Sequence, residues 1–141
     1  MAAIPRAGAL TGLMNQPTAQ VIDGSLKIES TSDTEGSYLT RTPSSAGNRK
    51  TWTWSAWLRR EKFGSEDGIF VSSDSNGNSD YTTLYFNTSD QLKTTSYQSS
   101  SIRWEYATNA KFRDTGWYHV VLDVDLNQGT HSNKVKLYIK G

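Results

Sequence analysis

Residues 117–126 read Trp-Tyr-His-Val-Val-Leu-Asp-Val-Asp-Leu, and this stretch decides the fold class. Apolar side chains recur at every second position from Tyr118 to Leu126, with a histidine and two aspartates among the residues between them. Because successive side chains of a strand point to opposite faces, this alternation is typical of a strand with one buried face. The stretch therefore predicts a β-strand that covers a hydrophobic core.

Similar segments occur on both sides of this strand. In residues 51–60, Trp52, Trp54 and Leu58 share one face, which we expect in the core, and Trp57 lies on the other face. Clusters of Ser, Asn, Asp, Thr and Gly separate the segments, as turns require. The predicted strands are Ser25–Ser30, Tyr38–Arg41, Thr51–Arg60, Gly68–Ser73, Thr82–Asn87, Gln91–Tyr97, Ile102–Ala107, Trp117–Asp125 and Asn133–Ile139. The sequence thus predicts an all-β antiparallel sandwich of jelly-roll type, with almost no helix.

Composition limits the classes of function. The chain has 141 residues, which suits one domain, and its 5 Trp, 7 Tyr and 4 Phe argue against disorder. Its net charge is +1, so we expect neither a nucleic acid nor a membrane as partner. The absence of Cys excludes disulfides, zinc-thiolate sites and a Cys nucleophile. Composition alone gives no function.

Three segments resemble one family. Residues 38–60, which end in Trp-Thr-Trp-Ser-Ala-Trp-Leu-Arg-Arg, resemble the opening of laminin-G-like, concanavalin A-like lectin/glucanase domains, as found in bacteriophage structural proteins. Residues 112–121 resemble the family's Trp-Tyr-His-hydrophobic strand, and residues 135–141 resemble its Leu-Tyr-Val-Asn-Gly hairpin strand. The likeness covers residues 22–141. It implies a lectin-like sandwich in a virion structural protein, such as a tail fiber or appendage component.

The first 24 residues have no counterpart in the lectin core. They carry few charges and include Pro5 and Pro17, so we expect an extended arm before a sandwich of residues 25–141. A short segment without its own core is ordered only against a partner surface, and the arm is therefore a candidate virion anchor. Its apolar anchors would be Ile4, Leu10, Leu13 and Met14.

The resemblance also raises a question at the other end of the chain. In the family, further strands follow the hairpin strand that ends here at Gly141. We expect a sandwich that is incomplete at this end, because missing strands would expose a sheet edge and part of the core. Either the native polypeptide continues, or equivalent subunits cover the edge. A homotrimer is the first guess for a phage fiber.

Enzymatic activity is not expected. A glycosidase of this fold would resemble the family's Glu-x-Asp-x-Glu strand, which is absent here. The nearest pattern is Asp123-x-Asp125, with His119 on the same face, and a solvated strand face explains it better than an acid–base cluster does. No cofactor is expected. The chemistry favours a non-enzymatic protein.

Two candidate binding sites remain. Sugars are bound by exposed aromatic faces flanked by hydrogen-bonding groups, and such residues occur on the less apolar faces of the strands. The candidates are Trp57, Tyr85, Tyr97, His119, Asp123 and Tyr138. Coverage of these aromatics by the second sheet or a neighbouring subunit is the alternative. The segment 74–80 spaces oxygen ligands at Asp74, Asn76, Asn78 and Asp80, which suits either Ca²⁺ or an ordinary hairpin turn.

Three classes of function therefore compete. The first is a virion protein that uses the sandwich to assemble with other virion proteins. The second is a carbohydrate-binding protein that recognises a glycan on the host surface. The third is a glycoside hydrolase-like enzyme. A docked arm would favour the first, a groove with exposed aromatics the second, and a cleft with convergent carboxylates the third.

Overall fold

The structure is a computed structural model that describes residues 24, 26–28, 30–32, 35–36, 38–74 and 79–141. The chain divides into two compact units, Met1–Ser44 and Ser45–Gly141, which are described separately. In the first unit, β1 (Ser30–Ser32) pairs with β2 (Glu35–Gly36) as a short antiparallel ribbon. The predicted anchors of the arm lie outside the described residues, so the arm stays a prediction.

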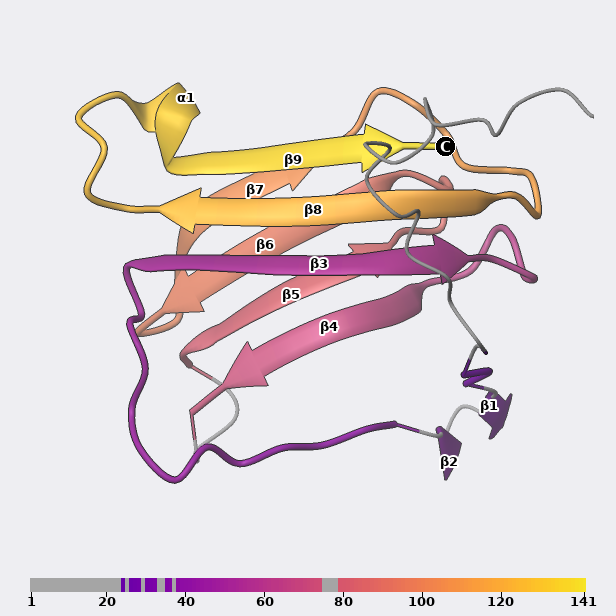
Figure 1. The fold of residues 1–141 in the computed structure, drawn as a ribbon, viewed down its shortest axis with the longest axis horizontal. Coiled ribbons are helices and arrows are strands. Elements are labelled where there is room, and N and C mark those ends of the chain that lie inside the picture. The colour runs from indigo at the N-terminus through magenta and orange to yellow at the C-terminus, as the bar shows by residue number, and fades with distance from the viewer. Residues whose placement is uncertain (1–23, 25, 29, 33–34, 37, 75–78) are drawn as a thin grey trace, which may run out of the picture. The chain divides into compact units, whose positions relative to one another are not determined.

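The second unit contains two antiparallel sheets (Figure 1). The three-stranded sheet has the order β3-β8-β9 and the four-stranded sheet the order β4-β5-β6-β7. The strands are β3 (Thr51–Arg59), β4 (Asp67–Ser73), β5 (Tyr81–Phe86), β6 (Leu92–Gln98), β7 (Ser101–Ala107), β8 (Trp117–Asp125) and β9 (Val135–Lys140). The predicted all-β, antiparallel fold class is confirmed.

The core lies between the inner faces of the two sheets. Val120, Leu122 and Val124 of β8 are buried on one side, which confirms the period-two pattern of the opening stretch. Leu84 and Leu92 of the four-stranded sheet are also fully buried. Full burial of a leucine contributes roughly 1.5–3 kcal/mol, so these residues hold the two sheets together.

The two tryptophans predicted for the core do lie on the inner face of β3. Trp52 and Trp54 are partly buried against the core, and their ring centroids lie 6.1 and 6.0 Å from that of Phe70 in β4. In register, Trp54 is opposite Leu122 of the neighbouring strand. The alternation of β3 thus sends Trp57 to the outer face.

Three predicted elements differ from the structure. Tyr38–Arg41 is wrong as a strand, because it pairs with none of the strands that the structure describes and Tyr38 is 80% exposed. Of the predicted strand Ser25–Ser30, only Ser30 lies in a described strand. The predicted start of the last strand at Asn133 is too early, since the one-turn helix α1 (His131–Lys134) precedes β9. Alternation alone cannot supply the partner strand that a β-strand needs.

A buried cluster of charges fixes one end of the sandwich. Arg60, directly after β3, is 5% exposed and donates to Asp67 at 2.7 Å, to Asp90 at 3.2 Å and to the Phe112 carbonyl at 2.9 Å. Arg113 donates to the other oxygen of Asp90 at 2.8 Å. The cluster therefore joins the end of β3, the start of β4 and the β5–β6 turn.

Within the described part of the chain, no helix has the length and apolarity to cross a membrane.

Candidate functional site

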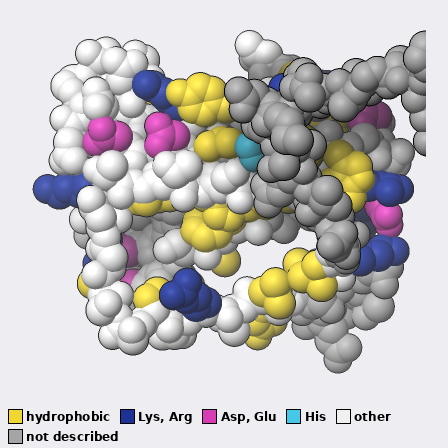
Figure 2. Space-filling view, in the orientation of Figure 1, with side chains coloured by type: hydrophobic (Ala, Val, Ile, Leu, Met, Phe, Trp, Pro, Cys, Tyr) yellow, Lys and Arg dark blue, Asp and Glu magenta, His cyan; other side chains and the backbone are white. Residues whose placement is uncertain are grey.

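The outer face of the three-stranded sheet brings together four of the six residues predicted to bind carbohydrate. Period-two alternation places Trp57 of β3, His119 and Asp123 of β8 and Tyr138 of β9 on this face, opposite to the buried set. In register, Trp57 is opposite His119 and Tyr138 is opposite Val121. Figure 2 views this face, on which acidic, histidine and hydrophobic side chains gather over β8 and β9.

Trp57 and His119 form a stacked aromatic pair on this face. The two rings are stacked, with 5.1 Å between centroids and 30° between planes. The imidazole Nε2 lies 2.9 Å from the Ser55 hydroxyl, which holds the ring in place. Trp57 remains 48% exposed and Tyr138 53% exposed. The face therefore presents aromatic surfaces to solvent beside hydrogen-bonding groups.

The two aspartates of β8 are held by threonines of β3. The Thr53 hydroxyl donates to Asp123 at 3.0 Å, and the Thr51 hydroxyl donates to Asp125 at 3.4 Å. Asp125 also accepts from the Gln128 amide at 2.6 Å. The hydrogen bond from Gln128, with others from Asn127 and Thr51, lowers the pKa of Asp125 below its usual value. Asp125 is thus a carboxylate that accepts hydrogen bonds at neutral pH.

Trp117 belongs to the same face and was not selected from the sequence. It begins β8, lies opposite Arg59 of β3 and is 47% exposed. The alternation that placed His119 on the outer face also places Trp117 there, so the signal was present in the sequence. The exposed aromatic surface therefore extends to the start of β8.

The other two predicted carbohydrate-binding residues lie on a different surface, the outer face of the four-stranded sheet. Tyr97 of β6 stacks on Tyr81 of β5 with 4.7 Å between ring centroids. Loss of solvent around Tyr81, together with the adjacent Tyr97, raises the pKa of the Tyr81 hydroxyl. Tyr85 lies on the same face, opposite Lys93 in register. The six residues are thus divided between two faces and do not form one site.

The predicted calcium ligands are only partly described. Asn76 and Asn78 lie outside the described residues. At the two sides of this segment, the Asp74 backbone N–H donates to the Asp80 carbonyl at 3.1 Å, and the Asp80 carboxylate accepts from the Ser99 backbone at 2.6 Å. Among the residues that the structure describes, no three or more His, Asp or Glu gather into a metal-binding group. The calcium site stays a prediction.

Comparisons with known proteins agree with the fold. A family model described as the concanavalin A-like lectin/glucanases superfamily matches residues 33–141, which include all strands of the sandwich. No curated protein and no solved structure matches the chain. By its description, the matched superfamily contains both lectins and glucanases. Membership therefore does not distinguish binding from catalysis, and the choice between them rests on the chemistry of the surface.

Proposed function

The chain belongs to the concanavalin A-like lectin/glucanases superfamily, and from this premise we propose that it is a non-enzymatic structural component of a bacteriophage virion. It would be part of a tail fiber or another appendage, where the lectin-like sandwich binds other virion proteins. The virion context rests on the resemblance of residues 38–60, 112–121 and 135–141 to phage structural proteins.

One observation carries the binding role: the exposed aromatic surface on the outer face of the three-stranded sheet. Trp57 is braced by His119, and Tyr138 is exposed on the same face. Tryptophan and tyrosine are enriched in the energetically dominant parts of protein interfaces, since they bury a large area with little loss of side-chain entropy. A half-exposed tryptophan held in a fixed orientation suits such a contact.

The chemistry of the aspartates supports a role without catalysis. Glycoside hydrolysis requires one carboxylic acid that stays protonated near neutral pH, beside a second carboxylate. The hydrogen bonds to Asp125 lower its pKa and favour the ionised form, which is the opposite of what a general acid needs. Asp123 accepts the Thr53 hydroxyl. Both side chains thus bind neighbouring groups of their own sheet.

The proposal includes self-association. We propose a homotrimer in the virion, with other virion proteins as further partners, no cofactor requirement, and residues 1–24 as the anchoring arm. Calcium binding by the segment 74–80 is a minor addition that leaves the rest of the proposal unchanged. Light scattering of the purified chain tests the trimer directly, because a monomer at micromolar concentration contradicts it.

Purified virions test the main proposal. An antibody raised against the chain should label intact particles in electron micrographs, and mass spectrometry should detect the chain in particles freed of soluble protein. The purified chain should release no reducing sugar from β-glucan or capsular polysaccharide. Expression in infected cells without incorporation into particles would overturn the virion role. Hydrolysis that is lost in Asp123→Ala would overturn the non-enzymatic role.

Carbohydrate recognition on the host surface is the second candidate. The specific observation in its favour is the grouping of Trp57 with the hydrogen-bonding groups of Ser55, Asp123 and Tyr138 on one face. An aromatic ring that stacks on a sugar and polar groups that bind its hydroxyls are the components of a sugar site. A glycan array distinguishes the candidates, because a saturable signal that Trp57→Ala abolishes favours recognition of a glycan.

A further inference from the structure

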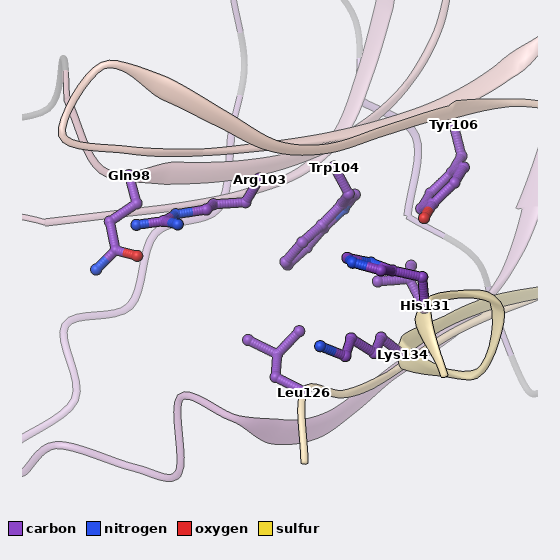
Figure 3. Close-up of a pocket in the computed structure, with 8 residues that line it drawn as sticks. Gln98, Arg103, Trp104, Tyr106, Leu126, His131 and Lys134 are labelled. Atoms are coloured by element: carbon purple, nitrogen blue, oxygen red, sulfur yellow. The ribbon is translucent and has the colours of Figure 1, made fainter. Parts of the chain in front are cut away.

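A cavity opens between the inner faces of the two sheets, at the end where β6 finishes and β9 begins. Its volume is about 310 Å³, and β7, α1 and the segment after β8 contribute most of its walls (Figure 3). It is lined by Gln98, Arg103, Trp104, Tyr106, Leu126, His131, Lys134 and Val135. The cavity is separate from the outer faces described above.

One wall of the cavity is aromatic and fixed. Trp104 of β7 is 9% exposed, and its indole N–H donates to the Thr94 hydroxyl at 3.4 Å. Tyr106 lies two residues further along the same strand, on the same side, and is 44% exposed. Leu126 and Val135 oppose this wall and pack against the core. The cavity is thus already formed and offers apolar contacts to a small side chain.

The charges of the cavity all have one sign. Arg103 of β7 lies along one wall with its guanidinium toward Gln98, and Lys134 of α1 lies on the facing wall (Figure 3). No Asp or Glu is among the described residues that line it. Across the described residues, neither Arg103 nor Lys134 takes part in an ion pair, whereas Arg60, Lys93 and Arg113 all do. The cavity therefore complements a negative charge.

The strands beside the cavity favour a peptide as the source of this charge. In the described part of the chain, β7 is the end strand of its sheet and β9 is the end strand of the other. An end strand has one edge whose backbone N–H and C=O groups are not used by a neighbouring strand, and such an edge binds extended peptides. A peptide paired with it projects alternate side chains to one side.

We propose that this cavity is a docking site for an acidic peptide segment that adds along β7. A glutamate or aspartate of the peptide pairs with Arg103 and Lys134, and an apolar side chain two residues away packs against Trp104 and Leu126. The volume is at the small end of the range for ligand sites, about 300–1,000 Å³, and accommodates one or two side chains. This site is independent of the outer face proposed above and does not depend on the virion role.

Synthetic peptides test the proposal on the full chain. The probe is a capped seven-residue peptide of Thr, Glu and Leu, in which Glu and Leu alternate with Thr so that both face one side. The matched peptide replaces each Glu by Gln and keeps the shape. We expect saturable binding of the Glu peptide by calorimetry, binding of the Gln peptide at least tenfold weaker, and a perturbed Trp104 indole N–H resonance. Raising the salt concentration should weaken binding of the Glu peptide, because salt screens the attraction between its carboxylates and the cavity.

Variants locate the contact. Arg103→Gln and Lys134→Gln should each lower the affinity for the Glu peptide at least fivefold. Lys136→Gln is the matched control, because Lys136 lies opposite Asp123 on the outer face of the three-stranded sheet. It should leave the affinity unchanged. If Arg103→Gln fails to fold, Lys134→Gln on the facing wall gives the same test.

Four results would overturn the proposal. The first is the absence of saturable binding by the Glu peptide. The second is equal affinity for the Glu and Gln peptides. The third is an equal loss of affinity for the Glu peptide in Lys136→Gln and Lys134→Gln. The fourth is tighter binding of glucuronate or a nucleotide than of the Glu peptide at the same Trp104 resonance, which would assign the cavity to a small molecule.

Discussion

The two ends of the sandwich differ in whether their basic side chains are paired with carboxylates. At the end where β6 begins, Arg60 is buried and contacts two carboxylates. At the end where β6 finishes, Arg103 and Lys134 line a cavity whose walls, as far as the structure describes them, contain no acidic residue. The same side-chain chemistry therefore stabilises the fold at one end and leaves a positive charge available for a ligand at the other. We call them the paired end and the open end.

The paired end also depends on aromatic packing. The Arg60 guanidinium lies 4.2 Å from the ring centroid of Phe86 and 5.2 Å from that of Phe63. Contacts with aromatic faces partly offset the cost of removing the charge from water. Asp90 accepts from Arg60, from Arg113 and from the Gly64 backbone. The buried charge is tolerated here because both terminal nitrogens of the Arg60 guanidinium donate to acceptors, although its buried Nε has no hydrogen-bond partner among the described residues.

The largest expected effect follows from breaking the paired end. Arg60→Met keeps much of the side-chain volume and leaves the buried Asp90 carboxylate without its most buried partner. Loss of one partner from a buried ion pair is strongly destabilising, and we expect the melting temperature to fall by roughly 10 °C or more. Arg103→Met at the open end is the matched control and should shift it by about 2 °C or less. Equal shifts in calorimetry would remove the distinction between the two ends.

Acidic pH should destabilise the paired end of the sandwich. Hydrogen bonds from the Gly64 backbone and from Arg113 and Arg60 lower the pKa of Asp90 from 3.8 to about 2. A carboxyl whose pKa is lowered by folding contributes stability above its unfolded pKa, and this contribution disappears as the pH falls through the folded pKa. The free energy of unfolding should therefore decrease between about pH 4 and pH 2, in part through Asp90.

The variant Asp90→Asn separates this group from the other carboxyls. It should be less stable than the natural protein at pH 7, and the difference should shrink as the pH falls from about 4 to about 2. Urea unfolding at a series of pH values measures the difference. A difference that stays constant down to pH 2 would mean that Asp90 has no lowered pKa.

The outer face of the three-stranded sheet should respond least. Thr53→Val removes the hydrogen bond to Asp123. Water can take the place of the lost donor, and the higher strand propensity of valine offsets part of the lost stability. We expect the melting temperature to change by about 2 °C or less. A change as large as that of Arg60→Met would show that this face stabilises the fold, and its role as a binding surface would lose support.

The sequence predicts the strands better than the contacts between distant segments. The alternation in β8 correctly separated Val120 and Leu122 from His119, because period two is a local property. The segment Tyr38–Arg41 carries a short pattern of the same kind but pairs with no strand in the described part of the chain. Register with a partner depends on tertiary structure, which the local pattern does not contain.

The sites follow the same rule. Trp57 and His119 are adjacent because two predicted strands pair in register, and the sequence selected both. The salt bridge between Arg60 and Asp90 joins residues 30 positions apart in loops with turn-forming composition, and no periodicity relates them. The alternation in β7 places Trp104 on one face of the strand, but it does not show that this face lines a cavity, because the facing wall comes from α1 and the segment after β8. Loop contacts and cavities arise only from the packed fold.

Incorporation into virions of two single variants tests the central claim, that the outer face of the three-stranded sheet binds partner proteins. Trp57→Ala removes the exposed aromatic contact of this face, whereas Val71→Ala removes a 66% exposed apolar side chain from the outer face of the four-stranded sheet. Quantitative mass spectrometry then gives the copies of each variant per particle. We predict at least a tenfold loss for Trp57→Ala and normal incorporation of Val71→Ala. Normal incorporation of a folded Trp57→Ala protein would contradict the account.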